Sequence, residues 1–222
     1  DLYNIQLTVI WEMSFELNCS FQKLFDVPHN IDLHEYPING MVKRANDFIC
    51  RNAAKAGIYL PIGYHLYLYD SEIAHHMKIN TDFNKLISNY RSVYIKTVER
   101  FYSGDKLFSN FRPVALLRDT INALTCNFSD NTIGVHIRRK DNIKAIQHSP
   151  LEIFIDQMNQ EINVKPQTKF FLATDSAEDE ARLKDIFGDR MITYPKVLER
   201  DSEKGIQDAL VDLYCLSNTK KI

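Results

Sequence analysis

The stretch Thr132-Ile133-Gly134-Val135-His136-Ile137-Arg138 decides the expected fold. It predicts a β-strand, in which successive side chains point to opposite faces. The two isoleucines and the valine therefore share one face, whereas Gly134, His136 and Arg138 share the other. A central strand of a parallel sheet is normally apolar on both faces, so a polar face toward its carboxyl end indicates a ligand, which in open α/β sheets binds at that end.

Strands and helices alternate downstream of this stretch. Such alternation predicts an α/β protein with a doubly wound, Rossmann-like parallel sheet. The expected elements are a helix over 150–162, a strand over 169–174, a helix over 177–187, a strand over 191–194 and a helix over 206–216. The last helix is predicted to bury one face, because its apolar residues follow the i, i+3, i+4, i+7 spacing: Ile206, Ala209, Leu210, Leu213 and Leu216.

Two serines stand where helices are expected to begin. Ser149 precedes Pro150, and Glu152 follows three residues after the serine, which predicts a capped helix that starts at the proline. Ser176 holds a similar place before the helix over 177–187. We interpret both serines as helix caps rather than as catalytic groups.

The first half of the chain is less regular. It contains an expected strand over 7–11, a long helix over 81–101 and a helix over 113–125. The polar run from Asn127 to Asn131 indicates a junction between domains. We therefore expect a GT-B-like arrangement of two Rossmann-like domains, with an acceptor-side α/β domain over 1–127 and a donor-binding domain over 132–222. The start of the first domain and the end of the second are expected to be missing.

Composition limits the class of protein. The 27 Lys and Arg nearly balance the 29 Asp and Glu, so the formal net charge of -2 offers no basic surface for nucleic acid. No apolar stretch approaches the roughly 20 residues that span a bilayer. We expect a cytoplasmic protein, with a possible membrane association, or a protein of the Golgi lumen if an anchor precedes residue 1. No metal site is expected, because the adjacent His75 and His76 would point apart on a helix.

Arg138 and Arg139 have the chemistry to hold a diphosphate. Arginine stays charged and makes bidentate, charge-assisted hydrogen bonds to phosphate oxygens. The alternative is a structural network in which the arginines pair with Asp141 or Asp175. Asp175 follows a strand and precedes a helix, so it is either a capping residue or an acceptor for a nucleotide base or ribose.

Two further acids, Asp208 and Asp212, lie one turn apart on the last expected helix. They fall off its apolar stripe. We therefore expect both carboxylates on a solvated face.

Three segments, in this order and spacing, resemble the donor-binding domain of the fucosyltransferase superfamily, which contains α1,6-, α1,2- and protein O-fucosyltransferases. The α1,6 and rhizobial nodulation-factor type is the most similar. The resemblance covers about 90 residues, 132–222, and its first segment is the most specific. The segments are His136-Ile137-Arg138-Arg139-Lys140-Asp141, Phe171-Leu172-Ala173-Thr174-Asp175-Ser176 and the stretch from Gly205 to Ser217.

The resemblance implies a GT-B fold and metal-independent, inverting transfer of fucose from GDP-fucose to a glycan acceptor, without a cofactor. His136 and Arg138 match the family positions that hold the donor diphosphate, and Arg139 is the adjacent basic position. Asp175 matches an acidic position associated with guanine recognition. The sequence does not determine the acceptor, the linkage or the oligomeric state.

The chain departs from the family where a general base is expected. The α1,6 type carries a carboxylate shortly after the first segment, where this chain has Asn142-Ile143-Lys144-Ala145-Ile146. Asp141 is our first candidate for the base and Glu12 the second. The Gly-rich segment with Asn-Arg near the amino end and the Ser-Ser-Phe-type loop after the last strand are also absent.

Two other classes of protein agree with the same residues. One is a non-catalytic nucleotide-sugar or glycan-binding protein that keeps the arginines but lacks the base. The other is a structural α/β domain whose arginines form only ion pairs.

Overall fold

The computed structural model describes residues 7–14, 17–37, 48–53, 56, 58, 64–101, 111–140, 148–199 and 201–222. The chain forms two compact units, one made of 1–36 and 111–222 and the other of 37–110. The sequence analysis assigns 1–127 to an amino-terminal domain. In the structure, two parts of that range, 1–36 and 111–127, belong to the same unit as the carboxyl-terminal strands.

A parallel three-stranded sheet lies at the centre of the first unit. It contains β5 (Thr132–Ile137), β6 (Lys169–Thr174) and β7 (Met191–Ile192), in the order β5-β6-β7. The register pairs His136 with Ala173 and Ile137 with Thr174. The carboxyl ends of β5 and β6 therefore lie side by side, as the ends of adjacent parallel strands do.

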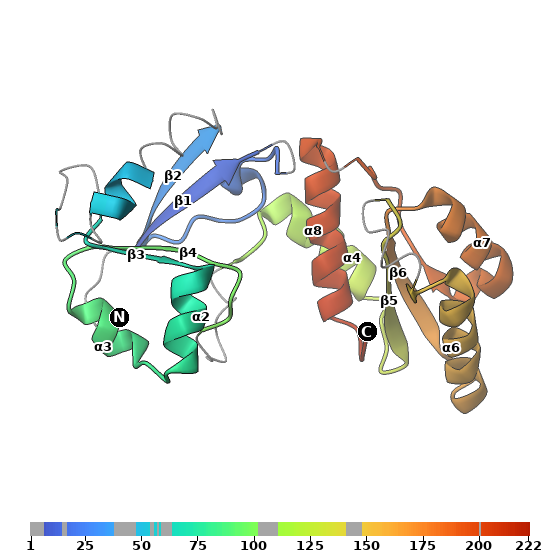
Figure 1. Cartoon of the computed structure of the whole chain (residues 1–222). Coiled ribbons are helices and arrows are strands. Elements are labelled where there is room, and N and C mark those ends of the chain that lie inside the picture. Colours follow the sequence, from blue (N-terminus) through green and yellow to red (C-terminus); the bar gives the residue numbers. More distant parts are fainter. Residues whose placement is uncertain are drawn as a thin grey trace. The chain divides into compact units, whose positions relative to one another are not determined.

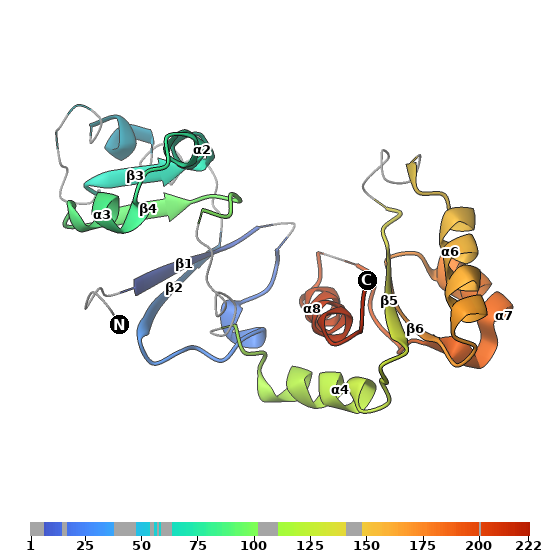
Figure 2. The same cartoon turned by 90° about the horizontal axis from the view of Figure 1, so that it is seen from below.

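Helices cover both faces of this sheet (Figures 1 and 2). On one face lie α6 (Leu151–Val164) and α7 (Ala177–Phe187), with η2 (Gly188–Arg190) after α7. On the other face lie α4 (Ala115–Thr125) and α8 (Glu203–Ser217). Two hydrophobic cores lie on the two faces of the sheet, and β6 contributes to both because its side chains alternate between the faces. Phe170 and Leu172 pack with α6 and α7, whereas Phe171 and Ala173 pack with α4 and α8.

Gly134 allows close packing against β5. A Cβ atom at this position would lie 2.8 Å from Thr219 Oγ1 and 2.9 Å from Leu216 Cδ2. The chain after α8 runs beside β5, where Lys220 donates its amide to the Thr132 carbonyl and Gly134 donates its amide to the Lys221 carbonyl. A side chain at 134 would separate these segments.

The remaining elements of the first unit are β1 (Leu7–Met13), paired with β2 (Ile31–Pro37), and the short helix η1 (Phe21–Lys23). Phe21, Leu24 and Phe25 are buried in the same core as α4 and α8. A bridge between Phe25 and Pro113 joins this region to the segment before α4. These contacts explain why the start of the chain belongs to the same unit as the sheet.

The second unit contains a parallel pair of strands, β3 (Leu66–Tyr69) and β4 (Val93–Lys96). Two helices, α2 (Asp70–Lys78) and α3 (Phe83–Ser88), connect them, and residues 48–53 are also helical (Figure 1). Leu68 of β3 and Ile73 of α2 are fully buried.

The structure is thus of the mixed α/β class with short parallel sheets, as the sequence predicts. The strands β5 and β6 and the helix α7 are confirmed almost to the residue. The long helix expected over 81–101 is wrong. It is replaced by α3 and β4, because Val93, Tyr94 and Ile95 pair with β3, and such β-branched and aromatic residues suit a strand.

The two expected helix caps differ in outcome. The Ser176 hydroxyl accepts the Asp179 amide at 3.1 Å, which confirms that cap. The prediction for Ser149 is wrong, because Pro150 itself is in an extended conformation and serves as the N-cap, so α6 begins at Leu151. Among the described residues, no helix combines the length and apolar character needed to cross a membrane.

Candidate ligand-binding site

A cavity of about 470 Å³ lies in the first unit, where β5 and β6 end. This volume is within the range of small-molecule sites. Its lining comes from the ends of both strands, the segment after β7, α8 and the residues that follow α8: His136, Ile137, Arg138, Ala173, Thr174, Asp175, Lys196, Val197, Leu198, Gly205, Ala209, Asp212, Leu213, Leu216, Ser217 and Ile222. The cavity therefore occupies the edge at which the sequence predicts a ligand.

His136 and Arg138 both line this cavity, and both are exposed. Strand alternation turns them to the face of β5 opposite Val135 and Ile137, which are buried against α6 and α7. The predicted partition of β5 into an apolar face and a polar face is thus confirmed. An imidazole and a guanidinium at one cavity edge can together donate hydrogen bonds to an anion.

Asp175 also lines the cavity, and its carboxylate holds the chain that follows β5. One oxygen, Oδ1, accepts the backbone amide of Arg139 at 2.7 Å, and Oδ2 accepts the amide of Lys140 at 3.1 Å. Asp175 is therefore not the helix cap that its position suggests, since Ser176 has that role. Its carboxylate caps the turn 138–140 instead.

The Arg139 side chain is engaged outside the cavity lining. Its Nε donates to Asp179 Oδ2 at 2.7 Å, one terminal nitrogen donates to the Ser149 carbonyl at 2.7 Å, and the guanidinium lies 5.9 Å from the Phe154 ring centre. Only 14% of the side chain is exposed. The structure thus brings His136, Arg138 and Asp175 together and holds the Arg139 side chain at α7.

A buried ion pair forms another part of the cavity wall. Lys196 Nζ lies 2.9 and 2.8 Å from the two carboxylate oxygens of Asp212 and donates to the Leu172 carbonyl at 3.3 Å. The exposed fractions of the two side chains are 3% for Lys196 and 15% for Asp212. This pair connects the segment after β7 to both β6 and α8.

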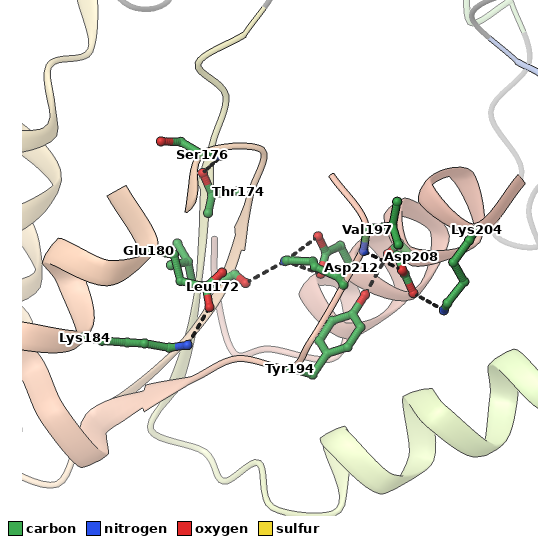
Figure 3. Close-up of polar contacts among 11 residues, drawn as sticks. Leu172, Thr174, Ser176, Glu180, Lys184, Tyr194, Val197, Lys204, Asp208 and Asp212 are labelled. Carbon is green, nitrogen blue, oxygen red and sulfur yellow. Dashed lines mark hydrogen bonds and ion pairs between the residues drawn. The ribbon is translucent and has the colours of Figure 1, made fainter. Parts of the chain in front are cut away.

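Asp208 and Tyr194 extend this network (Figure 3). The Asp208 carboxylate, which is 1% exposed, accepts the Val197 amide at 2.9 Å and the Lys204 ammonium at 2.5 Å. The Tyr194 hydroxyl donates to the Asp208 carbonyl at 2.8 Å. Residues 194–197 are consequently fixed against α8 at three points.

Burial dominates the electrostatics of this network. It raises the pKa of Asp212 to about 6, while the Lys196 charge acts in the opposite direction. Burial also raises the pKa of Tyr194 well above its ordinary value, and the nearby Asp212 charge adds to the rise. Tyr194 is therefore a neutral hydrogen-bond donor at physiological pH.

The expectation of a solvated face for Asp208 and Asp212 is wrong. Both face the sheet side of α8 together with Val211 and Cys215, which are fully or almost fully buried. The predicted apolar stripe is wrong in part, since Leu210 and Leu216 are buried but Ala209 and Leu213 are exposed and line the cavity. The buried face follows the same i, i+3, i+4, i+7 spacing when the acids are included, since it consists of Asp208, Val211, Asp212 and Cys215. This spacing was the signal in the sequence from which the buried face could have been found.

The two candidate bases are not assembled at this cavity by the part of the chain that the structure describes. Asp141 lies outside the described residues, as does the segment 142–146. Glu12 is a half-buried residue of β1 and is not among the residues that line the cavity. Within the described ranges, no group of three His, Cys, Asp or Glu residues has an arrangement suited to a metal ion.

No family model matches the chain, and no curated protein matches its sequence.

Proposed function

We propose that this chain is the donor-binding part of a metal-independent, inverting glycosyltransferase of the fucosyltransferase type, with GDP-fucose as the donor and a glycan as the acceptor. One observation carries the proposal. His136 and Arg138 line a cavity of about 470 Å³ at the carboxyl ends of two adjacent parallel strands, which is where open α/β sheets bind their ligands.

The composition of the cavity agrees with a nucleoside diphosphate. Its polar edge, with the His136 imidazole and the Arg138 guanidinium, suits the diphosphate, and the apolar side chains of Val197, Leu198 and Leu213 suit a flat base or a sugar ring. In the proposed reaction an acceptor hydroxyl attacks the anomeric carbon while the bond from that carbon to the phosphate oxygen breaks. The electron pair leaves with GDP, where Arg138 stabilises the developing charge.

The hydroxyl proton passes to a general base, for which Asp141 is the first candidate. The proposed GT-B arrangement assigns the acceptor to residues 1–127. A protein that binds the nucleotide sugar without transferring it is the alternative, and the two differ only in turnover.

Calorimetry with GDP, UDP and GDP-fucose tests the proposal. We expect GDP to bind, and we expect Arg138→Ala to weaken binding by about tenfold or more, because a charge-assisted bond to phosphate is lost. Arg182→Ala is the matched control, since it removes an exposed arginine of α7 whose partner is Glu152.

Absence of GDP binding at millimolar nucleotide would overturn the proposal. So would an equal loss of affinity in both arginine variants. Slow release of GDP from GDP-fucose, with water in place of the acceptor hydroxyl, would identify an enzyme and exclude the non-catalytic alternative.

A further inference from the structure

The turn 138–140 presents Arg138 to the cavity, and its conformation depends on one side chain. The sheet ladder ends with β5 at Ile137, so the amides of Arg139 and Lys140 lie beyond it. Both donate instead to Asp175, one to each carboxylate oxygen, at 2.7 and 3.1 Å. Hydrogen bonds to an ionised carboxylate are among the stronger ones in proteins.

This use of the amides determines what can hold an anion at this edge. Backbone amides that follow a strand often bind phosphate in α/β proteins. Here the two amides after Arg138 are already bonded to Asp175, so they are not available to an anion in the cavity. The position of the Arg138 side chain therefore matters more than it would in a glycine-rich loop.

The register of the sheet also argues against a role for Asp175 in reading a base. Ile137 pairs with Thr174, so the next residues, Arg138 and Asp175, leave the sheet side by side. Adjacent strands are about 4.8 Å apart. The terminal phosphate and the base of a nucleoside diphosphate lie at opposite ends of the molecule, so a ligand with its phosphate on Arg138 would not also have its base on Asp175.

We propose that Asp175 is a positioning residue for the anion site: its carboxylate holds the turn 138–140 and so aims Arg138 at the diphosphate, and it does not recognise the base. This inference rests on the proposed function for the identity of the ligand. The contact between Asp175 and the two amides is independent of that function.

The first test is the variant Asp175→Asn, with calorimetric titration of GDP and of inorganic diphosphate, which has no base. An amide group keeps one acceptor oxygen and places an NH₂ group against the second backbone amide, so one bond of the turn is lost. We expect both ligands to bind about tenfold more weakly, by a similar factor. Asp185→Asn, an exposed acid of α7, is the charge-matched control and should leave both affinities unchanged.

A double-mutant cycle shows whether Asp175 acts through Arg138. If it does, Asp175→Asn in the Arg138→Ala background should cost less than about twofold in GDP affinity. A full tenfold loss in that background would overturn the proposal. Weaker binding of GDP with unchanged binding of diphosphate would also overturn it, in favour of base recognition.

Amide exchange provides a measurement that needs no ligand. We expect the Arg139 and Lys140 amides to exchange faster in Asp175→Ala than in the wild-type protein, with the amides of β6 unchanged, as a check that the variant is folded. Unchanged exchange at 139 and 140 would refute the positioning role. If the wild-type protein binds neither GDP nor diphosphate, the proposed function fails, and the exchange rates still decide whether Asp175 holds the turn.

Discussion

Lys196 places a positive charge in the cavity wall with only 3% of its side chain exposed. A buried charge of this kind is tolerated when it is paired and hydrogen-bonded. Asp212 is the ion-pair partner of Lys196, and the Leu172 carbonyl accepts a further hydrogen bond from its ammonium group. The two partners depend on each other, because loss of either one leaves an uncompensated charge in a medium of low dielectric constant.

Replacement of Lys196 with Met should make the stability of the first unit more sensitive to pH. The pKa of Asp212 is raised to about 6 by burial, against the opposing effect of Lys196, so it should rise further without the lysine. A carboxyl group has a pKa near 4 in an unfolded chain. The folded state therefore binds more protons than the unfolded state above about pH 4, and the stability that this group contributes falls as the pH rises through the folded pKa.

We expect Lys196→Met to lose about 3 kcal/mol at pH 8 and clearly less at pH 5, where Asp212 becomes protonated. Urea unfolding at the two pH values measures this difference. Lys184→Met is the control, because Lys184 forms a more exposed pair with Glu180 and its loss should cost less than about 1 kcal/mol. An equal loss of unfolding free energy for Lys196→Met at pH 5 and pH 8 would contradict the role of Asp212 as the buried group whose protonation causes the difference.

At the scale of elements, the sequence was most informative where one signal dominated. Alternation in β5 and the apolar run of β6 identify both strands, and the Ser176 cap fixes the start of α7. The strand β4 was missed because one helix was expected over the whole of 81–101. Val93, Tyr94 and Ile95 have the residue types that favour a strand, and their pairing with β3, which is distant in sequence, adds to this local preference.

The candidate site was predictable only in part, for a related reason. His136, Arg138 and Asp175 leave the sheet at a predictable edge. The sequence did not identify Lys196 and Asp212 as residues of the site. Two acids one turn apart on α8, Asp208 and Asp212, are typical of a solvated helix face as long as the lysine that pairs with Asp212 is unknown. Their burial depends on Lys196 and on the Val197 amide, which belong to a different segment.

The first turn of α8 should tolerate no side chain at Gly205. A Cβ atom there would lie 1.8 Å from the Glu199 carbonyl oxygen, which is a backbone atom that cannot rotate away. We expect Gly205→Ala to destabilise the protein by about 1–3 kcal/mol through overpacking. Thermal unfolding measures the loss, with Ala209→Gly at an exposed site of the same helix as a control that should cost about 1 kcal/mol. Wild-type stability in Gly205→Ala would contradict the packing described for this turn.

At the scale of the whole molecule, every residue that lines the cavity belongs to the first unit. A change in the core of the second unit should therefore affect stability without affecting nucleotide binding. Ile73 is fully buried there, and Ile73→Ala should destabilise that unit by about 2–5 kcal/mol.

Denaturant unfolding and GDP calorimetry on the same Ile73→Ala protein test this separation, and we expect an unchanged Kd. Leu183→Ala is the matched variant in the first unit, since Leu183 is fully buried in the core between the sheet and its helices. A loss of nucleotide affinity in this variant would be consistent with the separation of the two units. A weaker Kd in Ile73→Ala would mean that the nucleotide site needs the second unit.

The absence of a side chain at Gly134 has a consequence for protein engineering. It lets Leu216, Thr219 and Ile222 approach β5, and two of these residues, Leu216 and Ile222, also line the cavity. A larger residue at 134 would press on that wall from β5, two residues before His136. Position 134 is therefore a place from which the size of the cavity can be changed without replacing His136 or Arg138, and graded substitutions there could select among ligands by bulk.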